Sequence, residues 1–256
     1  MTKLKTLGLL LSAAMLASCG TSTIQDITGP LGGARIKFFN FGINAPSVNF
    51  YANGAKMSAT SSTTGVEAVT GVSYGSVSAG GNYSTITAGS YALTGKIAAT
   101  VDKDLVVSSL TGAIADGKLY SFYISGFYDA VAKTAEGFLV EDAMPATFDY
   151  TQAYVRFVNA SPNSSPMNLF AKNTTTTTEV PVGGLVAYKA AGAFTAVPAA
   201  VYDLGTRVSG SSTNAISRTA TSFVAGKYYT ITARGDMTIV STTLTNRPFL
   251  DNTANR

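Results

Sequence analysis

Histidine and tryptophan are absent from this 256-residue sequence, and cysteine occurs once, at Cys19. Without histidine the chain cannot form a Ser-His-Asp triad or a Cys-His dyad, and it lacks the commonest zinc ligand. A single cysteine provides no intrachain disulfide, even in an exported protein. These absences remove the usual nucleophilic hydrolases from consideration. They favour a protein without catalytic, cofactor-binding or metal-binding residues.

Charge is also scarce. Charged residues make up 12% of the chain, about half of the usual ~25%. The 18 basic residues exceed the 14 acidic ones only slightly, and they form no cluster resembling a phosphate-binding stripe, so nucleic acid is not an expected partner. The polar surface must therefore come mainly from Thr, Ser, Asn and Gly. These residues, together with the β-branched and aromatic ones, favour strands and turns.

The N-terminus has the layout of a secretory signal peptide. Lys3 and Lys5 precede the apolar segment LGLLLSAAML at 7–16, and small residues follow it. The segment is shorter than the roughly 20 apolar residues that a membrane-spanning helix needs. We therefore expect residues 1–18 to be a signal peptide that is helical and is removed on export.

The position of the one cysteine adds a lipid anchor to this expectation. Leu16-Ala17-Ser18-Cys19 resembles the bacterial lipobox. The resemblance implies cleavage before Cys19 and acylation of that residue, and two or more acyl chains anchor a protein stably. Gly20 is compatible with the outer membrane if the organism is Gram-negative. We expect a protein of the cell envelope that contacts the membrane through this anchor and a flexible lipidated tether at 19–34.

Three collinear blocks predict an internal duplication. IKFFNFGINAPSVNFYANG (36–54) aligns without gaps to VRFVNASPNSSPMNLFAKN (155–173). GNYSTITAGSYALTGKI (81–97) aligns to GAFTAVPAAVYDLGTRV (192–208), and GKLYSFYISG (117–126) to GKYYTITARG (226–235). The sequence thus predicts one domain at 35–143, a linker at 144–152, a second domain at 153–246 and a short C-terminal tail at 247–256.

Short alternating runs indicate that both domains are all-β. In Leu119–Tyr128, Tyr120, Phe122 and Ile124 share one face, and turn signals such as Asp116-Gly117 interrupt the runs. No long segment has a helical period. The pattern predicts two tandem immunoglobulin-like antiparallel β-sandwich domains.

Two tyrosines fit the corner found in such sandwiches. ADGKLYSF (115–122) and VAGKYYTI (224–231) place Tyr120 and Tyr229 near the start of a strand, and Phe122 and Ile231 two residues later in the core position. We expect each hydroxyl to bond main chain of its own corner. Two ordinary strand tyrosines are the alternative.

The same segments resemble the bacterial repeat family called domain of unknown function 4397. RIKFFNFGINAPSVNFYANG, VSYGSVSAGGNYSTITAGSYAL and YVRFVNASPNSSPMNLF carry the resemblance, and Asn159-Ala160-Ser161-Pro162 matches the first signature of the family best. Phe41-Gly42 departs from it. The resemblance implies exported, often lipid-anchored β-sandwich proteins of the cell envelope, and it implies no catalytic residue.

Other motifs favour structural roles. Gly71-Val72-Ser73-Tyr74-Gly75 matches G-x-S-x-G, but a nucleophile elbow needs a histidine and a strand–turn–helix context. Asp102-Lys103-Asp104 has only part of the ligand set of a calcium-binding loop. A solvated hairpin tip explains these residues better. Glu141-Asp142 ends a predicted strand, and the sequence shows no second carboxylate positioned to act with it in general acid–base catalysis.

Two further features leave alternatives open. The Thr174–Thr178 run predicts a polar, disordered hairpin tip, with glycosylation or ligand contact as the alternative. A string of aromatic residues favours core packing over sugar or base stacking, because opposite faces of one strand carry it: Tyr120, Phe122, Tyr123, Phe127 and Tyr128.

The sequence as a whole favours a lipid-anchored envelope protein with a non-catalytic binding or adhesion role. An envelope protein or a glycan is the expected ligand, and the oligomeric state stays open. A purely structural surface spacer is one alternative. A glycan-active hydrolase with an Asp/Glu pair assembled from distant strands is the other.

Overall fold

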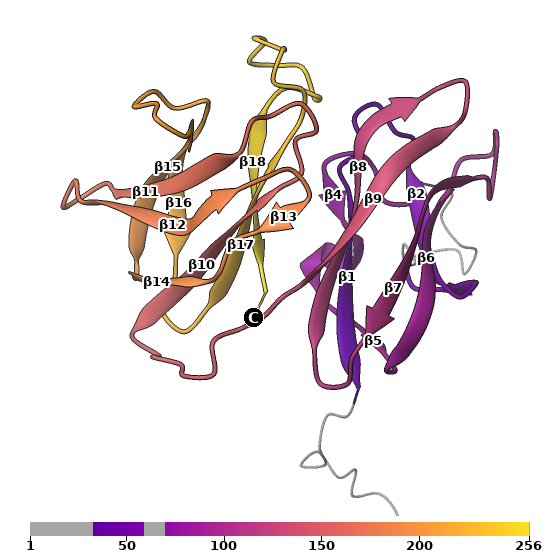
Figure 1. The fold of residues 1–256 in the computed structure, drawn as a ribbon, viewed down its shortest axis with the longest axis horizontal. Coiled ribbons are helices and arrows are strands. Elements are labelled where there is room, and N and C mark those ends of the chain that lie inside the picture. Colours follow the sequence, from indigo (N-terminus) through magenta and orange to yellow (C-terminus); the bar gives the residue numbers. More distant parts are fainter. Residues whose placement is uncertain (1–32, 59–69, 256) are drawn as a thin grey trace, which may run out of the picture. The chain divides into compact units, whose positions relative to one another are not determined.

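The computed structural model describes residues 33–58 and 70–255. These residues form strands and turns, and the one helical element among them is a short 3-10 turn, η1 (Ser78–Gly81) (Figure 1). No helix in this part of the chain is long and apolar enough to cross a membrane. The predicted signal peptide and Cys19 lie outside the described residues. The tether predicted at 19–34 ends too late, because Ala34 already begins a strand and is buried.

The first half consists of two facing sheets. One has the order β4-β1-β8-β9, with β5 paired to the other end of β1, and the second has the order β3-β2-β6-β7. The strands are β1 (Ala34–Asn40), β2 (Val48–Ala52), β3 (Ala55–Lys56), β4 (Ser76–Val77), β5 (Ser84–Ile86), β6 (Gly89–Ile97), β7 (Val106–Ile114), β8 (Leu119–Asp129) and β9 (Thr134–Glu141).

The second half repeats this arrangement strand for strand. Its sheets have the orders β13-β10-β17-β18, with β14 paired to β10, and β12-β11-β15-β16. The strands are β10 (Gln152–Asn159), β11 (Met167–Asn173), β12 (Glu179–Val186), β13 (Ala190–Ala191), β14 (Thr195–Pro198), β15 (Ala200–Val208), β16 (Ile216–Phe223), β17 (Tyr228–Arg234) and β18 (Phe249–Ala254).

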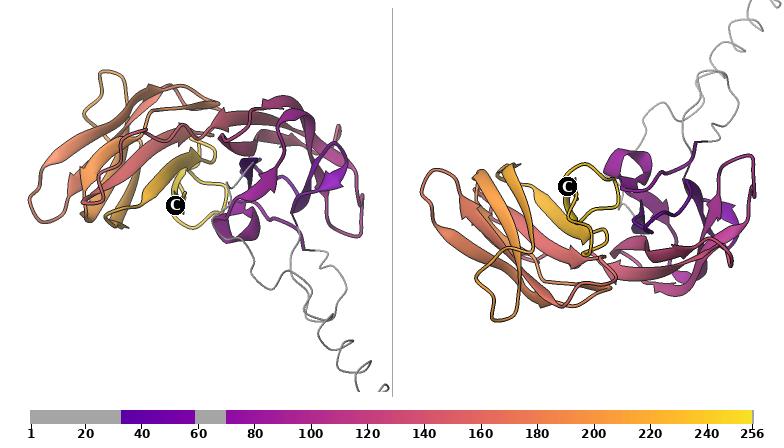
Figure 2. Two further views of the ribbon diagram at one scale, coloured as in Figure 1. Left: turned by 90° about the horizontal axis from the view of Figure 1, so that it is seen from below. Right: turned by 90° about the horizontal axis from the view of Figure 1, so that it is seen from above.

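One strand pair in each half is parallel. β1 runs parallel to β8 with Ile36 opposite Tyr120, and β10 runs parallel to β17 with Val155 opposite Tyr229. All other pairs are antiparallel, and Figure 2 shows the strands of each half in two layers. The all-β sandwich class is therefore confirmed. The parallel pairs have no signal in the sequence, and the interpretation of the shared strand order as a gene duplication stays a prediction.

Side chains that alternate along the facing sheets fill a core in each half. In the first, Phe38 of β1 stacks on Phe50 of β2 at 5.1 Å between ring centroids, and Phe122 of β8 meets both rings edge-on. In the second, Phe157 of β10 and Ile231 of β17 are fully buried in the corresponding cluster. These two cores account for the period-two pattern of the sequence.

A third cluster joins the two halves. On the outer face of the first sheet, Tyr123 stacks between Phe39 and Phe138, with centroids 4.4 and 4.8 Å away. Val158 and Ala160 of the second half belong to the same buried cluster. Core packing is thus confirmed for three aromatics of β8 (Tyr120, Phe122 and Tyr123), and β8 is buried on both faces because the second half covers its outer side. Phe127, farther along the strand, is 49% exposed.

The predicted C-terminal tail at 247–256 is wrong. Phe249–Ala254 forms β18, which pairs along β17 from Tyr229↔Ala254 to Arg234↔Phe249. Leu250 is fully buried in the core of the second half. The second sheet therefore needs this segment as a strand, and the second half extends past residue 246.

Part of the predicted linker at 144–152 also packs on the second half. Phe148 stacks on Tyr154 and on Tyr228, each at 5.2 Å between centroids. The Asp149 amide donates a hydrogen bond of 2.8 Å to the Tyr154 hydroxyl. The linker residues Phe148 and Asp149 therefore belong structurally to the second sandwich.

Candidate functional site

Tyr120 and Tyr229 make the contacts expected of tyrosine corners. The Ala115 amide donates to the Tyr120 hydroxyl, and the Val224 amide donates to the Tyr229 hydroxyl, each over 3.1 Å and five residues upstream. Phe122 and Ile231, two residues farther along, are fully buried. These tyrosines fasten the turn that crosses from one sheet to the other, so their role is structural.

We expect Tyr120→Phe to lower the free energy of unfolding by about 1–2 kcal/mol, because the mutation leaves the Ala115 amide unpaired in a part-buried corner. Urea unfolding followed by circular dichroism measures this change. Tyr91→Phe is the control, because the Tyr91 hydroxyl forms an exposed hydrogen bond with the Thr87 hydroxyl and holds no backbone amide in the described part of the chain. Equal effects of the two mutations would contradict the corner.

The motif that resembles domain of unknown function 4397 is built into the fold. The Asn159 amide donates to the Ser164 hydroxyl at 2.9 Å and to the Val186 carbonyl at 3.3 Å. The Ser161 hydroxyl donates to the Gly235 carbonyl at 2.7 Å. Asn40, at the matching position of the first half, donates to two carbonyls. These side chains tie a strand end to neighbouring loops and are not available to a ligand.

The remaining candidates from the sequence occupy turns. The Ser73 hydroxyl lies 3.1 Å from the Ser76 hydroxyl in a turn that leads into the short strand β4. Asp102 pairs with Lys133 at 3.1 Å at the tip of a hairpin. Asn173 caps the Thr174–Thr178 turn by accepting two backbone amides. In the described part of the chain, no group of three or more His, Cys, Asp or Glu residues has the arrangement of a metal site.

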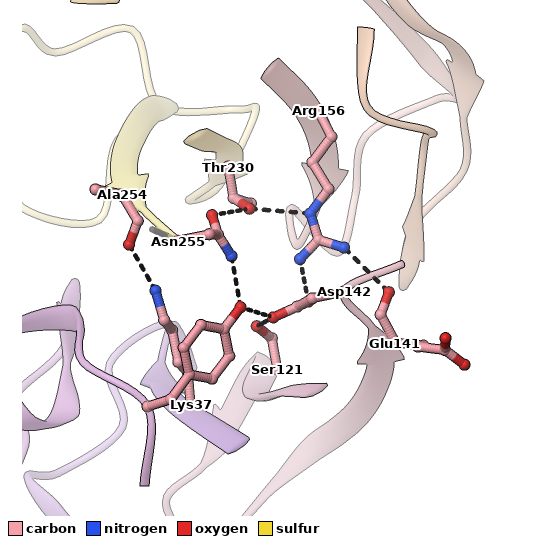
Figure 3. A network of polar contacts seen from close by, with 9 residues as sticks. Lys37, Ser121, Glu141, Asp142, Arg156, Thr230, Ala254 and Asn255 are labelled. Carbon is pink, nitrogen blue, oxygen red and sulfur yellow. Dashed lines mark hydrogen bonds and ion pairs between the residues drawn. The ribbon is translucent and has the colours of Figure 1, made fainter. Parts of the chain in front are cut away.

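A buried ion pair connects the two halves. The Arg156 guanidinium of β10 forms a short contact with the Asp142 carboxylate, and both side chains are almost fully buried. Arg156 also donates to the Thr230 hydroxyl at 2.9 Å and to the Glu141 carbonyl at 3.1 Å (Figure 3). The Ser121 hydroxyl donates to Asp142 at 2.8 Å. Each charge therefore has several partners, as a buried ion pair requires.

A second buried cation, Lys37 of β1, lies beside this pair. Its amine donates to the Ala254 carbonyl at 2.6 Å and lies 4.3 Å from the centre of the Tyr83 ring. The Tyr83 hydroxyl donates to Asp142 at 2.5 Å and accepts from the Asn255 amide at 2.9 Å. Burial lowers the pKa of Lys37 to about 8, with Asp142 opposing the shift and Arg156 adding to it. Burial also raises the pKa of Tyr83 above its usual range.

These contacts make the network a structural junction. Its members come from both halves, and Lys37, Asp142 and Arg156 are each about 1% exposed. An adjacent hollow of about 320 Å³ contains Asp116, Lys118 and Glu141. The Glu141 carboxylate is paired with Lys118 at 2.9 Å, and both oxygens of Asp142 accept hydrogen bonds. The hydrolase alternative needs an Asp/Glu pair, and here both Glu141 and Asp142 already have partners.

A separate hollow lies in the second half, beside the loop between β17 and β18. It has a volume of about 510 Å³. The corresponding connection in the first half is the tight turn between β8 and β9, so residues 235–248 are an elaboration of the second half alone. Its lining comes from that loop, the start of β16 and the start of β18: Ala215, Ile216, Ser217, Met237, Ile239, Val240, Ser241, Thr242, Arg247, Pro248 and Phe249.

The loop is held in shape by its own hydrogen bonds. The Asp236 amide donates to the Asn246 carbonyl at 2.9 Å, and the Asp236 carboxylate accepts from the Thr238 amide and hydroxyl. The Ser241 hydroxyl accepts two further amides. Val240 at its tip is 94% exposed. A long, internally bonded loop with an exposed apolar tip is typical of a binding loop.

Three guanidinium groups surround the ring of Phe249. Arg218, Arg234 and Arg247 lie 5.7, 5.1 and 5.2 Å from its centre. Arg234 is paired with Asp251, whereas Arg218 and Arg247 bond carbonyls and have no carboxylate partner among the described residues. The sequence gives no local signal for this site, because RPFLDNTANR at 247–256 has the composition of a tail. Of the three arginines, Arg247 lines the hollow, so the hollow has one cationic group among mainly apolar and hydroxyl side chains.

A known protein family matches part of the chain. Residues 153–256 match the family described as domain of unknown function (DUF4397). The matched segment begins in β10 and includes β18, so it spans the second half as the structure describes it. The second half is therefore similar to this family. No curated protein matches the chain.

Proposed function

We propose that this chain is a lipid-anchored protein of the cell envelope with a non-catalytic binding role. The N-terminal pattern that ends in Cys19 supports the anchor. The hollow beside the loop at 235–248 supports binding, and it is the observation that carries the proposal. A spacer that binds nothing needs no such loop.

An acidic glycan fits the chemistry of this hollow. Arg247 offers a guanidinium without a carboxylate partner in the described part of the chain, and guanidinium groups bind carboxylates in two-pronged fashion. Phe249 and Val240 offer apolar surface to a sugar face, while Ser241 and Thr242 add hydroxyls. A neutral ligand leaves the guanidinium without a counter-charge.

Replacing Arg247 with alanine is expected to weaken binding of a uronic-acid oligosaccharide at least tenfold, because a charge-assisted hydrogen bond is lost. Titration calorimetry of the purified chain measures the affinity. Lys172→Ala is the control, because Lys172 is an exposed cation of β11 that does not line the hollow. A neutral oligosaccharide of equal length is expected to bind more weakly than the acidic one.

Two results decide against this proposal. If neither oligosaccharide binds, the spacer is the better description. If the acidic oligosaccharide is cleaved, and Glu141→Gln abolishes the cleavage, the hydrolase is the better description.

The proposed lipid anchor can be tested separately from the binding role. Cys19→Ser removes the acylated thiol, and the buried methylenes that hold the chain at the membrane contribute roughly 0.8 kcal/mol each. We expect the variant to move from the membrane fraction to the soluble fraction of the envelope, as followed by immunoblotting. Ser18→Ala is the matched control, because it keeps a small residue before the cysteine. A variant that stays in the membrane fraction would remove the lipid anchor from the proposal.

A further inference from the structure

Lys37 is unusual because its amine is buried and forms no ion pair with any residue that the structure describes. Lys37 is 1% exposed, and its amine donates a hydrogen bond to the Ala254 carbonyl. No carboxylate among the described residues lies within ion-pair distance of it. Lysine is almost never fully buried unless it is paired. A desolvated lysine is readily neutral, and a neutral amine is a nucleophile.

A carboxamide lies next to this amine. Asn255 directly follows Ala254, whose carbonyl holds the Lys37 amine, and is itself buried. Its amide nitrogen donates to the hydroxyl of Tyr83, and the ring of Tyr83 lies under the Lys37 amine. Figure 3 shows the Lys37 and Asn255 side chains on the same side of the network. The amine and the carboxamide therefore both contact Tyr83, and the carbonyl that holds the amine belongs to the residue directly before Asn255.

The groups around Asn255 match the needs of acyl transfer. The Thr230 hydroxyl donates to the Asn255 side-chain oxygen at 2.8 Å and accepts from Arg156, which polarises it toward the oxygen where negative charge develops. On the other side, the Tyr83 hydroxyl links the amide nitrogen to the Asp142 carboxylate. This chain of groups can carry a proton to the leaving nitrogen.

We propose that Lys37 and Asn255 form an intramolecular isopeptide bond. The neutral Lys37 amine attacks the Asn255 side-chain carbon, and the C–N bond to the amide nitrogen breaks. One proton passes from the attacking nitrogen to the leaving nitrogen through Tyr83, with Asp142 as the base, and ammonia departs. The sum is amine plus carboxamide giving a secondary amide plus ammonia, with no oxidant or reductant. The bond fastens the end of β18 to β1 and thereby joins the two halves covalently.

Tryptic peptide mapping of the full chain, purified from membranes in detergent, tests this bond. Acylated Lys37 resists trypsin, so Ile36–Lys56 is expected in one branched peptide with Gly235–Arg256, lighter than the two linear peptides together by one ammonia. Lys37→Arg and Asn255→Ala are expected to give linear peptides only, and the surface variant Lys103→Arg to keep the branched one. Tyr83→Phe is expected to slow its accumulation at least tenfold.

The wild-type map decides the matter without relying on the folding of any variant. Recovery of the branched peptide from the wild type supports the bond. Recovery of Asn255 only in a linear peptide, unchanged or deamidated, after incubation at pH 7 and at pH 9, overturns it.

Discussion

Asp142→Ala is expected to lower the free energy of unfolding by about 3–5 kcal/mol, because it leaves the Arg156 guanidinium buried without its counter-ion. Tyr83 and Ser121 lose their shared acceptor at the same time. A loss of this size is a large part of the 5–15 kcal/mol by which most domains are stable. Chemical unfolding followed by tyrosine fluorescence measures it.

The neighbouring residue provides the control for this experiment. Glu141 forms an exposed pair with Lys118, and exposed pairs contribute little. Glu141→Ala is therefore expected to leave the unfolding midpoint almost unchanged. The double variant Asp142→Leu/Arg156→Met is expected to recover much of the loss, since it removes both buried charges together. Equal effects of Asp142→Ala and Glu141→Ala on the free energy of unfolding would show that the ion pair between Asp142 and Arg156 does not stabilise the fold.

Ending the chain after Asn246 is expected to prevent the second half from folding. The truncation removes β18, so β17 loses the strand paired to it from Tyr229 to Arg234. It also removes the buried Leu250, and emptying one buried leucine site costs 2–5 kcal/mol in itself. Near-ultraviolet circular dichroism and solubility on expression measure the outcome.

A chain that ends at Asn255 is the control for the truncation, because it keeps all of β18. We expect it to fold like the full chain. If the chain ending at Asn246 instead unfolds at the same temperature as the full chain, residues 247–256 are a tail after all.

The sequence predicts a strand well where one face of the strand is buried and the other is exposed to solvent. Phe38 and Phe122 follow that rule, and their alternation indicates the inner face of the sandwich. The run ARIKFFN of β1 does not follow it, because the second half also buries Lys37 and Phe39. Period-two reasoning assigns the outer face to solvent, so it has no means of finding the third cluster.

The junction and the hollow could not be found from local pattern for a related reason. Asp142 finds its partner Arg156 across the linker, and neither residue has a motif around it. One signal was present: Lys37 and Arg156 occupy matching positions of the two aligned blocks, so both halves place a cation at the same point of their first strand. The strand β18 follows a proline and mixes polar with apolar residues. Such a segment has no clear alternation and is easily mistaken for an unstructured C-terminal tail.

Hydrogen exchange read by mass spectrometry tests the central claim that the two halves are one folding unit joined at this junction. In moderate denaturant, peptides from β8 and from β17 are predicted to exchange in the same cooperative step, and Asp142→Ala is predicted to accelerate both by the same factor. The claim is contradicted if β17 exchanges independently of β8, with Asp142→Ala affecting β8 alone.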